Sequence, residues 1–310
     1  MVINIVLPCY NEEAVLVETN HQLLSLTDNW LSNKIVDDFR IIYVDDGSKD
    51  RTWEIIESLC NGSQRVRGLK LAHNAGHQYA LWAGLMWSVD KCDAVISIDA
   101  DLQHDIHKMA EMIEAYRNGA EVVYGVRNDR ATDSKFKKKT ALGFYKMMQK
   151  MGVDLIPNHA DFRLLGSKAL KALSEYPERN LFLRGMVRTL GFKEQIIYFD
   201  CLDRVAGESK YTLSKMVNLA IDGITSFWVV PLRIITVIGL ACVGISALEI
   251  IYILIQYFRG SVIQGWTSLL FSVWFLGGLT LFAIGVLGEY LGKIYKEVKR
   301  RPRYIIEKEA

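Results

Sequence analysis

Cysteine is scarce in this 310-residue chain, which holds five: Cys9, Cys60, Cys92, Cys201 and Cys242. They are scattered, odd in number and without Cys-x-x-Cys spacing, so we predict neither a cysteine zinc site nor a disulfide framework. Net charge is also nearly absent, because 37 Lys and Arg residues stand against 35 Asp and Glu residues. We therefore expect a reducing surrounding and no nucleic-acid partner.

The amino terminus lacks the basic residues and the apolar length of a secretory signal, because Pro8 interrupts the run Val2–Leu7. We interpret this run as a buried first strand. Towards the carboxyl end, residues 260–288 contain no charged side chain, and residues 234–255 contain a single one, Glu249. About 20 apolar residues span a bilayer as a helix, so we predict two transmembrane helices at about 233–257 and 264–288.

The flanks of these spans predict their orientation. One basic residue, Arg259, lies between them, whereas the segment 289–310 contains Lys293, Lys296, Lys299, Arg300, Arg301, Arg303 and Lys308. Basic residues favour the cytoplasmic side, so we expect a multi-pass protein of the cytoplasmic membrane with both termini in the cytoplasm. Gly288 and Gly292 have the GxxxG spacing of packed membrane helices, from which we expect a homo-oligomer.

The amino-terminal part alternates apolar runs with segments of helical periodicity. The expected strands are Val2–Leu7, Arg40–Val44, Gly68–Leu71, Ala94–Ile98 and Glu121–Tyr124. This alternation predicts an α/β domain with a mostly parallel, Rossmann-like sheet over residues 1–212. A juxtamembrane amphipathic helix at 213–230, the membrane hairpin at 231–288 and a basic tail at 289–310 complete the expected organisation. A further basic amphipathic stretch, 132–151, is either a membrane-surface helix or a solvated helix with one core face.

Acidic residues follow two of the expected strands. Asp45 and Asp46 come after the second, where a carboxylate can accept hydrogen bonds from a ribose or a base, although turn formation alone explains the Gly47 and Ser48 that follow. After the fourth come Asp99, Asp101 and Gln103, whose i, i+2 spacing on an extended segment would point their oxygens to one side. Oxygen ligands suit Mg²⁺ or Mn²⁺, so we predict a metal site here.

Seven short motifs occur in one order ahead of the two apolar spans: PCYNEE, VDDGSKDRT, DADLQHD, YGVR, ADFRLL, FLRG and RVAGESKY. In this combination the chain resembles glycosyltransferase family 2, over essentially its whole length. Within the family it resembles the polyprenyl-phosphate glycosyltransferases, such as bactoprenol glucosyltransferases and dolichyl-phosphate mannose synthases.

The resemblance implies a GT-A catalytic domain and a role for particular residues. The nucleotide pocket would draw on Pro8, Tyr10, Glu12, Asp45 and Asp46. Asp99, Asp101 and Gln103 would match the metal-binding group, with Asp99 also close to the nucleotide and Asp101 counted as catalytic. Arg127, Arg204 and Lys210 would bind phosphates, to which arginine offers directed paired hydrogen bonds. Asp161 is either a catalytic carboxylate or part of a salt-bridged loop with Arg163.

The reaction implied is inverting transfer of one sugar from a nucleotide-diphosphate sugar, with UDP-glucose preferred, to a polyprenyl phosphate such as undecaprenyl phosphate. GDP-mannose and UDP-N-acetylglucosamine stay open as donors. A processive polysaccharide synthase would carry a QxxRW motif and more spans, and neither is found. The alternative of another class is a non-catalytic membrane protein that binds a nucleotide sugar.

Overall fold

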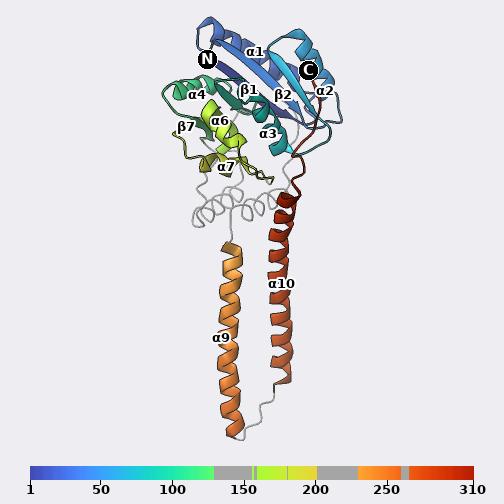
Figure 1. Ribbon diagram of the computed structural model, residues 1–310, viewed down its shortest axis with the longest axis vertical. Coiled ribbons are helices and arrows are strands. Elements are labelled where there is room, and N and C mark those ends of the chain that lie inside the picture. Colours follow the sequence, from blue (N-terminus) through green and yellow to red (C-terminus); the bar gives the residue numbers. More distant parts are fainter. Residues whose placement is uncertain (129–155, 157–158, 180, 201–229, 260–264) are drawn as a thin grey trace. The chain divides into compact units, whose positions relative to one another are not determined.

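The computed structural model describes residues 1–128, 156, 159–179, 181–200, 230–259 and 265–310. The chain divides into two compact units. The first, here called the sheet unit, is Met1–Met216 together with Arg301–Ala310; the second, here called the helical unit, is Val217–Arg300. Figure 1 shows the elements of both units.

The sheet unit is built on one eight-stranded sheet, with the order β7-β5-β6-β4-β1-β2-β3-β8. The strands are β1 (Val2–Cys9), β2 (Asp38–Asp45), β3 (Val66–Leu71), β4 (Ala94–Ser97), β5 (Val122–Arg127), β6 (His159–Gly166), β7 (Glu194–Phe199) and β8 (Ile306–Glu309). β1 is parallel to β2 and β4, β2 is parallel to β3, and β5 is parallel to β7. β6 is antiparallel to both neighbours, and β8 is antiparallel to β3. The expected mostly parallel sheet is confirmed.

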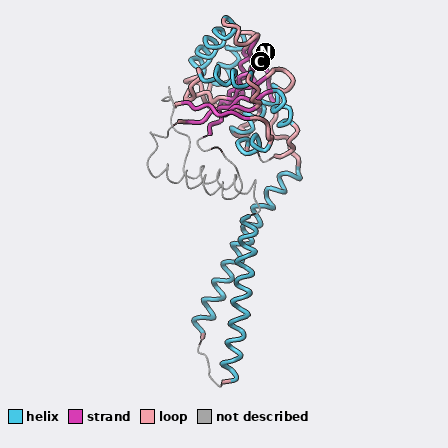
Figure 2. Tube along the Cα trace, turned by 90° about the vertical axis from the view of Figure 1, so that its left-hand side faces the viewer, coloured by secondary structure: helices cyan, strands magenta, loops and turns pink. Residues whose placement is uncertain are grey.

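Helices cover both faces of this sheet (Figure 2). They are α1 (Leu16–Ser32), α2 (Thr52–Gly62), α3 (His77–Ser88), α4 (Lys108–Arg117), α6 (Ser167–Ser174) and α7 (Leu183–Thr189). Side chains alternate along a strand, so Ile3, Ile5 and Leu7 of β1 join one core with α1, α2 and α4. Val6 points to the other face, where α3 packs closely because Gly84 has no Cβ; one built there would lie 2.3 Å from Val6 Cγ1.

The five expected strands are all present, although their ends differ by a few residues. β4 ends at Ser97, one residue before the expected end, and β3 begins at Val66, two residues before the expected start. Three strands were not expected: β6, β7 and β8. β6 is buried along its whole length although it includes His159, Asp161 and Arg163.

The last ten residues belong to the sheet unit and extend its edge. β8 pairs with β3, and Gly68 and Ala310 exchange two backbone hydrogen bonds of 2.9 Å. The Arg303 guanidinium lies 4.3 Å from the ring centre of buried Trp82 on α3 and donates to the Tyr176 carbonyl at 2.5 Å. Both ends of the chain therefore lie in one folded unit.

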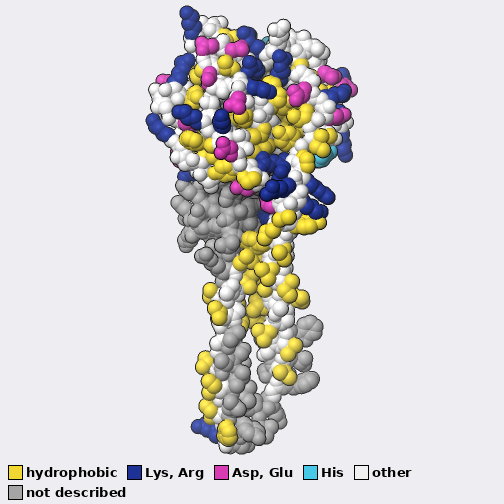
Figure 3. Space-filling model, viewed as in Figure 1, with side chains coloured by type: hydrophobic (Ala, Val, Ile, Leu, Met, Phe, Trp, Pro, Cys, Tyr) yellow, Lys and Arg dark blue, Asp and Glu magenta, His cyan; other side chains and the backbone are white. Residues whose placement is uncertain are grey.

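The helical unit contains two long helices, α9 (Val230–Phe258) and α10 (Trp266–Lys299). Many of their described apolar side chains are exposed, including Leu240, Leu248, Leu281 and Phe282. Figure 3 shows hydrophobic side chains along both helices. By length and hydropathy one segment of the described residues, Phe275–Lys299, is suited to crossing a membrane. The expected amphipathic segments at 132–151 and 213–230 lie outside the described residues, except for Val230, with which α9 begins.

Candidate functional site

The loops that follow β1 and β2 are joined by hydrogen bonds between backbone and side chain. The Asn11 N–H donates to Ser48 Oγ, and Asn11 Oδ1 accepts from the Lys49 N–H, both at 2.9 Å. The Glu12 N–H donates to Thr52 Oγ1 at 2.9 Å. Of the residues predicted for the nucleotide pocket, Pro8 is buried, and Tyr10 and Glu12 are partly buried in the same loop. The carboxyl ends of β1 and β2 thus form one connected rim.

Asp45 and Asp46 are buried at this rim, with exposed fractions of 0% and 3%. Asp45 Oδ1 accepts from the Ser48 N–H at 3.0 Å, while Asp45 Oδ2 has no hydrogen-bond partner in the described chain. Asp46 accepts from the N–H groups of Ala75 and Gly76 at 2.7 and 3.0 Å. Burial raises the pKa of both carboxyls against the lowering effect of these bonds. Asp45 therefore keeps one buried oxygen without a hydrogen-bond donor in the described chain.

Gly47 allows the β2–α2 loop to press against the β3–α3 loop. Its φ is +64°, and a Cβ would lie 2.6 Å from the Asn74 nitrogen. No other side chain fits this left-handed, crowded position without a backbone shift. The close approach is what lets Asp46 reach Ala75 and Gly76, directly before α3 begins.

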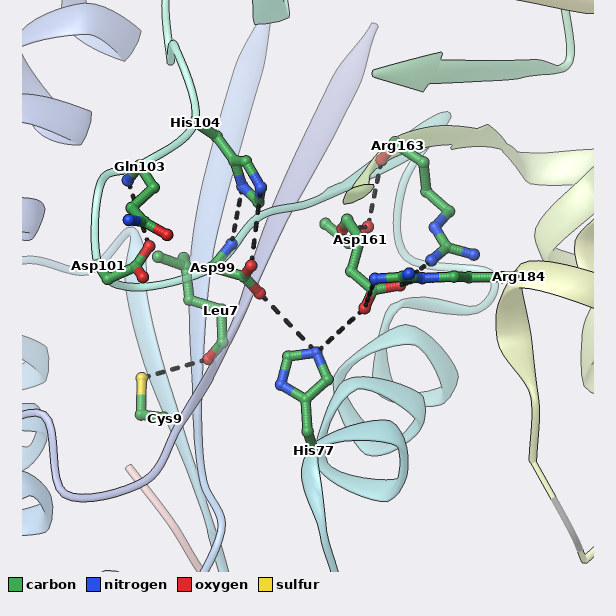
Figure 4. A network of polar contacts seen from close by, with 11 residues as sticks. Leu7, Cys9, His77, Asp99, Asp101, Gln103, His104, Asp161, Arg163 and Arg184 are labelled. Atoms are coloured by element: carbon green, nitrogen blue, oxygen red, sulfur yellow. Dashed lines mark hydrogen bonds and ion pairs between the residues drawn. The ribbon is translucent and has the colours of Figure 1, made fainter. Parts of the chain in front are cut away.

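The Asp99–Gln103 segment is a turn and not the extended segment that its spacing suggested. Leu102 has a φ of +55°, an unfavourable value for a branched side chain, of the kind found at functional sites. Asp101 Oδ1 accepts from the Gln103 N–H at 3.2 Å. The two aspartates therefore share one loop, but Asp99 faces His77 and His104 whereas Asp101 lies beside Gln103 (Figure 4).

Asp99 lies between two histidines whose pKa values shift in opposite directions. His104 is buried against Phe162, and burial lowers its pKa despite Asp99. Its Nδ1 accepts from the Asp99 N–H at 3.4 Å, so the neutral ring carries its proton on Nε2, which is 3.6 Å from Asp99 Oδ2. His77 Nε2 lies 3.8 Å from Asp99 Oδ1. Burial opposes the charge on His77, but Asp161 and Asp99 together raise its pKa.

Asp161 is the centre of a buried ion-pair network (Figure 4). Arg184 binds both of its oxygens, at 3.3 Å from Nε and 3.1 Å from Nη2, and Arg163 pairs with Oδ1. His77 Nε2 is 3.5 Å from Oδ2. Burial would raise the pKa of Asp161, but Arg184, His77 and Arg163 hold it well below its usual range. Asp161 is therefore ionised at neutral pH and salt-bridged, although within β6 and not within a loop.

The other predicted residues fall into two groups. Arg127 ends β5, and its positive charge acts on His104, which brings it near the Asp99 loop. Its Nε is buried and has no hydrogen-bond partner in the described chain. Arg204 and Lys210 lie outside the described residues.

Sequence reasoning missed His77 and Arg184. His77 is the first residue of α3, in the loop region that follows β3, and the rule that directs attention to strand ends could have found it. Arg184 is in the FLRG motif but was given no role from sequence.

The described residues contain no group of three His, Cys, Asp or Glu side chains arranged to hold a metal ion. Magnesium at phosphate-handling sites is, however, usually held by one or two carboxylates, with water and substrate phosphates completing its shell. Asp99 and Asp101 fit this second arrangement. Asp99 is 33% exposed, and the histidine nitrogens at 3.6 and 3.8 Å are too distant for hydrogen bonds, so its oxygens keep their capacity to bind a cation.

Comparison with known proteins gives matches over the sheet unit and over the whole chain. The family described as glycosyl transferase family 2 matches residues 4–174. A Bacillus subtilis (strain 168) protein described as an uncharacterized glycosyltransferase, YkoT, is 50% identical over 307 residues, which cover 99% of this chain and 91% of that protein. The SfII prophage-derived bactoprenol glucosyl transferase of Shigella flexneri is 41% identical over 313 residues, which cover 99% and 98%.

Among solved structures, glucosyl-3-phosphoglycerate synthase from Mycobacterium tuberculosis, in complex with Mn²⁺, uridine-diphosphate and phosphoglyceric acid, matches with a TM-score of 0.44 and 18% identity. The match covers 71% of this chain and 75% of that one.

Proposed function

The chain belongs to glycosyl transferase family 2, and from this premise we propose that it transfers one glucose from UDP-glucose to a polyprenyl phosphate. The observation that carries the proposal is the 41% identity to a bactoprenol glucosyl transferase over the full length of both chains, apolar helices included. The arrangement of the site supports it, because acceptors for a nucleoside and groups for phosphates lie along one edge of the sheet.

In this proposal one side of the rim binds the nucleoside of the donor and the other side binds its diphosphate. Asp45, with one unpaired buried oxygen, accepts from the nucleoside, beside Pro8, Tyr10 and Glu12. Asp99 and Asp101, with Gln103 beside them, would hold Mg²⁺ or Mn²⁺, which would supply positive charge to offset that of the leaving diphosphate. Arg127 adds a guanidinium near the same phosphates.

The reaction breaks the bond between the anomeric carbon and the donor phosphate oxygen and forms a bond to an oxygen of the acceptor phosphate. The nucleoside diphosphate leaves with the bonding electron pair, and attack from the opposite face inverts the anomeric centre. A phosphate monoester, with a second pKa of about 6, is largely ionised at neutral pH and needs no general base. Asp161, whose pKa is held low by its cationic neighbours, suits the part of an anchor for Arg184 better than that of a proton acceptor.

We also propose that α9 and α10 form a two-helix membrane hairpin with the sheet unit and both termini on the cytoplasmic side. Support comes from the return of Arg301–Ala310 to the sheet unit, because two ends in one folded unit require an even number of crossings. The basic residues that end α10, Lys296 and Lys299, favour the cytoplasmic side. Arg204 and Lys210 would bind the acceptor phosphate from the membrane side, and an oligomer is expected from the Gly288 and Gly292 spacing.

The test is transfer of label from a panel of UDP- and GDP-sugars to undecaprenyl phosphate by the purified full chain in detergent. We expect label from UDP-glucose in the lipid phase with Mg²⁺ or Mn²⁺ and none with EDTA. The Asp101→Asn variant should lose about 100-fold or more in turnover, since it removes a charge that holds the ion. Label from GDP-mannose alone would mean that GDP-mannose, and not UDP-glucose, is the donor. Nucleotide binding without any lipid product would favour a non-catalytic protein. Wild-type turnover and metal dependence in Asp101→Asn would contradict the metal assignment.

A further inference from the structure

The first turn of α3 contacts three separate parts of the site. His77 Nε2 lies between Asp99 of the loop after β4 and Asp161 of β6. The next residue, Gln78, accepts from the Leu183 N–H at 3.2 Å, where α7 begins. Tyr79 then donates from its hydroxyl to the Arg179 carbonyl at 2.5 Å. Three consecutive residues thus fix the Asp99 loop, Asp161 and the segment that leads to Arg184.

α3 is itself held firmly at this place. Asp46 binds the N–H groups of Ala75 and Gly76 immediately before the helix. Gly76 has a φ of +101°, which lets the chain turn into the helix at that point. The body of α3, from Ala80 to Leu85, is buried against the sheet. His77 therefore projects from a rigid support, as a residue that fixes others must.

Asp99 and Asp161 both face the same imidazole nitrogen. Two carboxylates that face one site repel each other, and a polar N–H group between them offsets this repulsion. His77 lies between them, with its Nε2 3.5 Å from Asp161 Oδ2 and 3.8 Å from Asp99 Oδ1, and its side chain is 41% exposed at the site. Asp99 belongs to the half of the site that suits a cation, and Asp161 to the half that carries guanidinium groups.

We infer that His77 is a positioning residue, which holds Asp99 and Asp161 at a fixed separation and so sets the spacing between the metal-binding and arginine-bearing halves of the site. The inference rests on the proposed function, because the spacing matters for a donor whose diphosphate meets both halves. The role requires an N–H at the place of Nε2 and does not require an imidazole. A glutamine side chain places its amide nitrogen at a similar reach and offers two N–H groups.

The test compares His77→Ala and His77→Gln in the purified full chain, with His21→Ala as the matched control. His21 is an exposed histidine of α1, on an element that does not contribute to the Asp99–Asp161 network. We expect His77→Ala to lower kcat with UDP-glucose and undecaprenyl phosphate by about 10- to 100-fold, since a misplacement of about 1 Å costs this much. The KM for UDP-glucose should change by less than about threefold, because the Asp45 side is untouched. His77→Gln should recover most of the lost kcat, and His21→Ala should match the wild type.

Two further readouts separate positioning from folding and from the proposed function. The thermal midpoint of His77→Ala should stay within about 2 °C of the wild type, as for an exposed side chain, and binding of UDP by calorimetry should stay within about threefold. Structures of the variants should show the Asp99 carboxylate displaced in His77→Ala and in place in His77→Gln. This last readout holds even if the wild type transfers no sugar, an outcome that would defeat the proposed function alone.

Three results would overturn the inference. The first is wild-type kcat in His77→Ala, or an unmoved Asp99 carboxylate in its structure. The second is His77→Gln as inactive as His77→Ala, which would assign a chemical role to the imidazole. The third is loss of UDP binding and thermal stability in parallel with activity, which would make His77 merely structural.

Discussion

Two groups of buried carboxylates lie along the same edge of the sheet, and their surroundings differ. At the end of β2, Asp45 and Asp46 accept from backbone N–H groups and, for Asp45, from the Ser48 side chain, and burial raises their pKa values. In β6, Asp161 is also buried but lies against two guanidinium groups and an imidazole, which hold its pKa well below the usual range. Backbone dipoles offset burial in part, whereas formal positive charges reverse its effect.

The difference suits the two halves of a nucleotide-sugar donor. A nucleoside offers hydroxyl and N–H donors, for which a carboxylate with an unused oxygen such as Asp45 is sufficient. A diphosphate brings negative charge, which requires cations held in place by anions of the protein. Asp161 fixes Arg184 and Arg163 in this way. The comparison predicts that changes in β6 have larger effects than equivalent changes at the end of β2.

The largest effect is expected from Asp161→Asn, which removes one charge from a buried network and leaves Arg163 without its anionic partner. Breaking a buried ion pair costs about 3–5 kcal/mol, to be measured at pH 7 by thermal or denaturant unfolding of the full chain in detergent. The pKa of Asp161 is lower in the folded chain than in the unfolded chain. Its ionised form therefore contributes its full share to the free energy of unfolding above about pH 4–5, and this share is lost as the pH falls through the folded pKa. The difference in free energy of unfolding between the wild type and Asp161→Asn should therefore be smaller at about pH 3 than at pH 7.

Glu194→Gln provides the control for this change, because it removes the partner of Arg188 in a more exposed ion pair. Arg188 lies on α7, the helix that also carries Arg184. An exposed pair contributes about 0–1 kcal/mol, so the control should differ little from the wild type. Two results would show that the network around Asp161 is not what stabilises β6. One is an equal loss of unfolding free energy in the two variants, and the other is a loss for Asp161→Asn that does not vary with pH.

A smaller effect is expected from Asp46→Asn. The amide oxygen still accepts from Ala75 or Gly76, but the amide nitrogen replaces the oxygen that faces the Gly76 N–H, so about one hydrogen bond is lost, or about 1 kcal/mol. The same unfolding measurement checks this value. A loss as large as that of Asp161→Asn would contradict the distinction between the two groups of carboxylates.

The part of the fold predicted from sequence is the part whose residues are apolar. β1, β2 and β4 were found because fully buried parallel strands are continuous apolar runs, and the acidic residues at their ends identified Asp45, Asp46, Asp99 and Asp101. β6 was not predicted, because His159, Asp161 and Arg163 interrupt the apolar pattern, and these charges are buried only because they find partners in other elements. β8 is short and charged, and it forms only because the edge of β3 is there to pair with it.

The site was predicted where function follows from local spacing and missed where it follows from tertiary contact. The turn at Leu102 could not be read from the Asp99–Gln103 spacing, which suits an extended segment equally well. His77 and Arg184 come from α3 and α7, which the sequence does not show to be neighbours. Their contacts with Asp161 arise only when the two helices are folded against the sheet.

The most direct test of the account is the position of a bound manganese ion in a structure of the full chain crystallised with UDP-glucose and Mn²⁺, located by its anomalous scattering. The account predicts a single peak in contact with the carboxylate of Asp99 or Asp101, with the nucleoside beside Asp45 and the diphosphate between the ion and Arg127. A nucleotide bound elsewhere, or a manganese ion that contacts neither aspartate, would contradict the assignment of this edge of the sheet as the donor site.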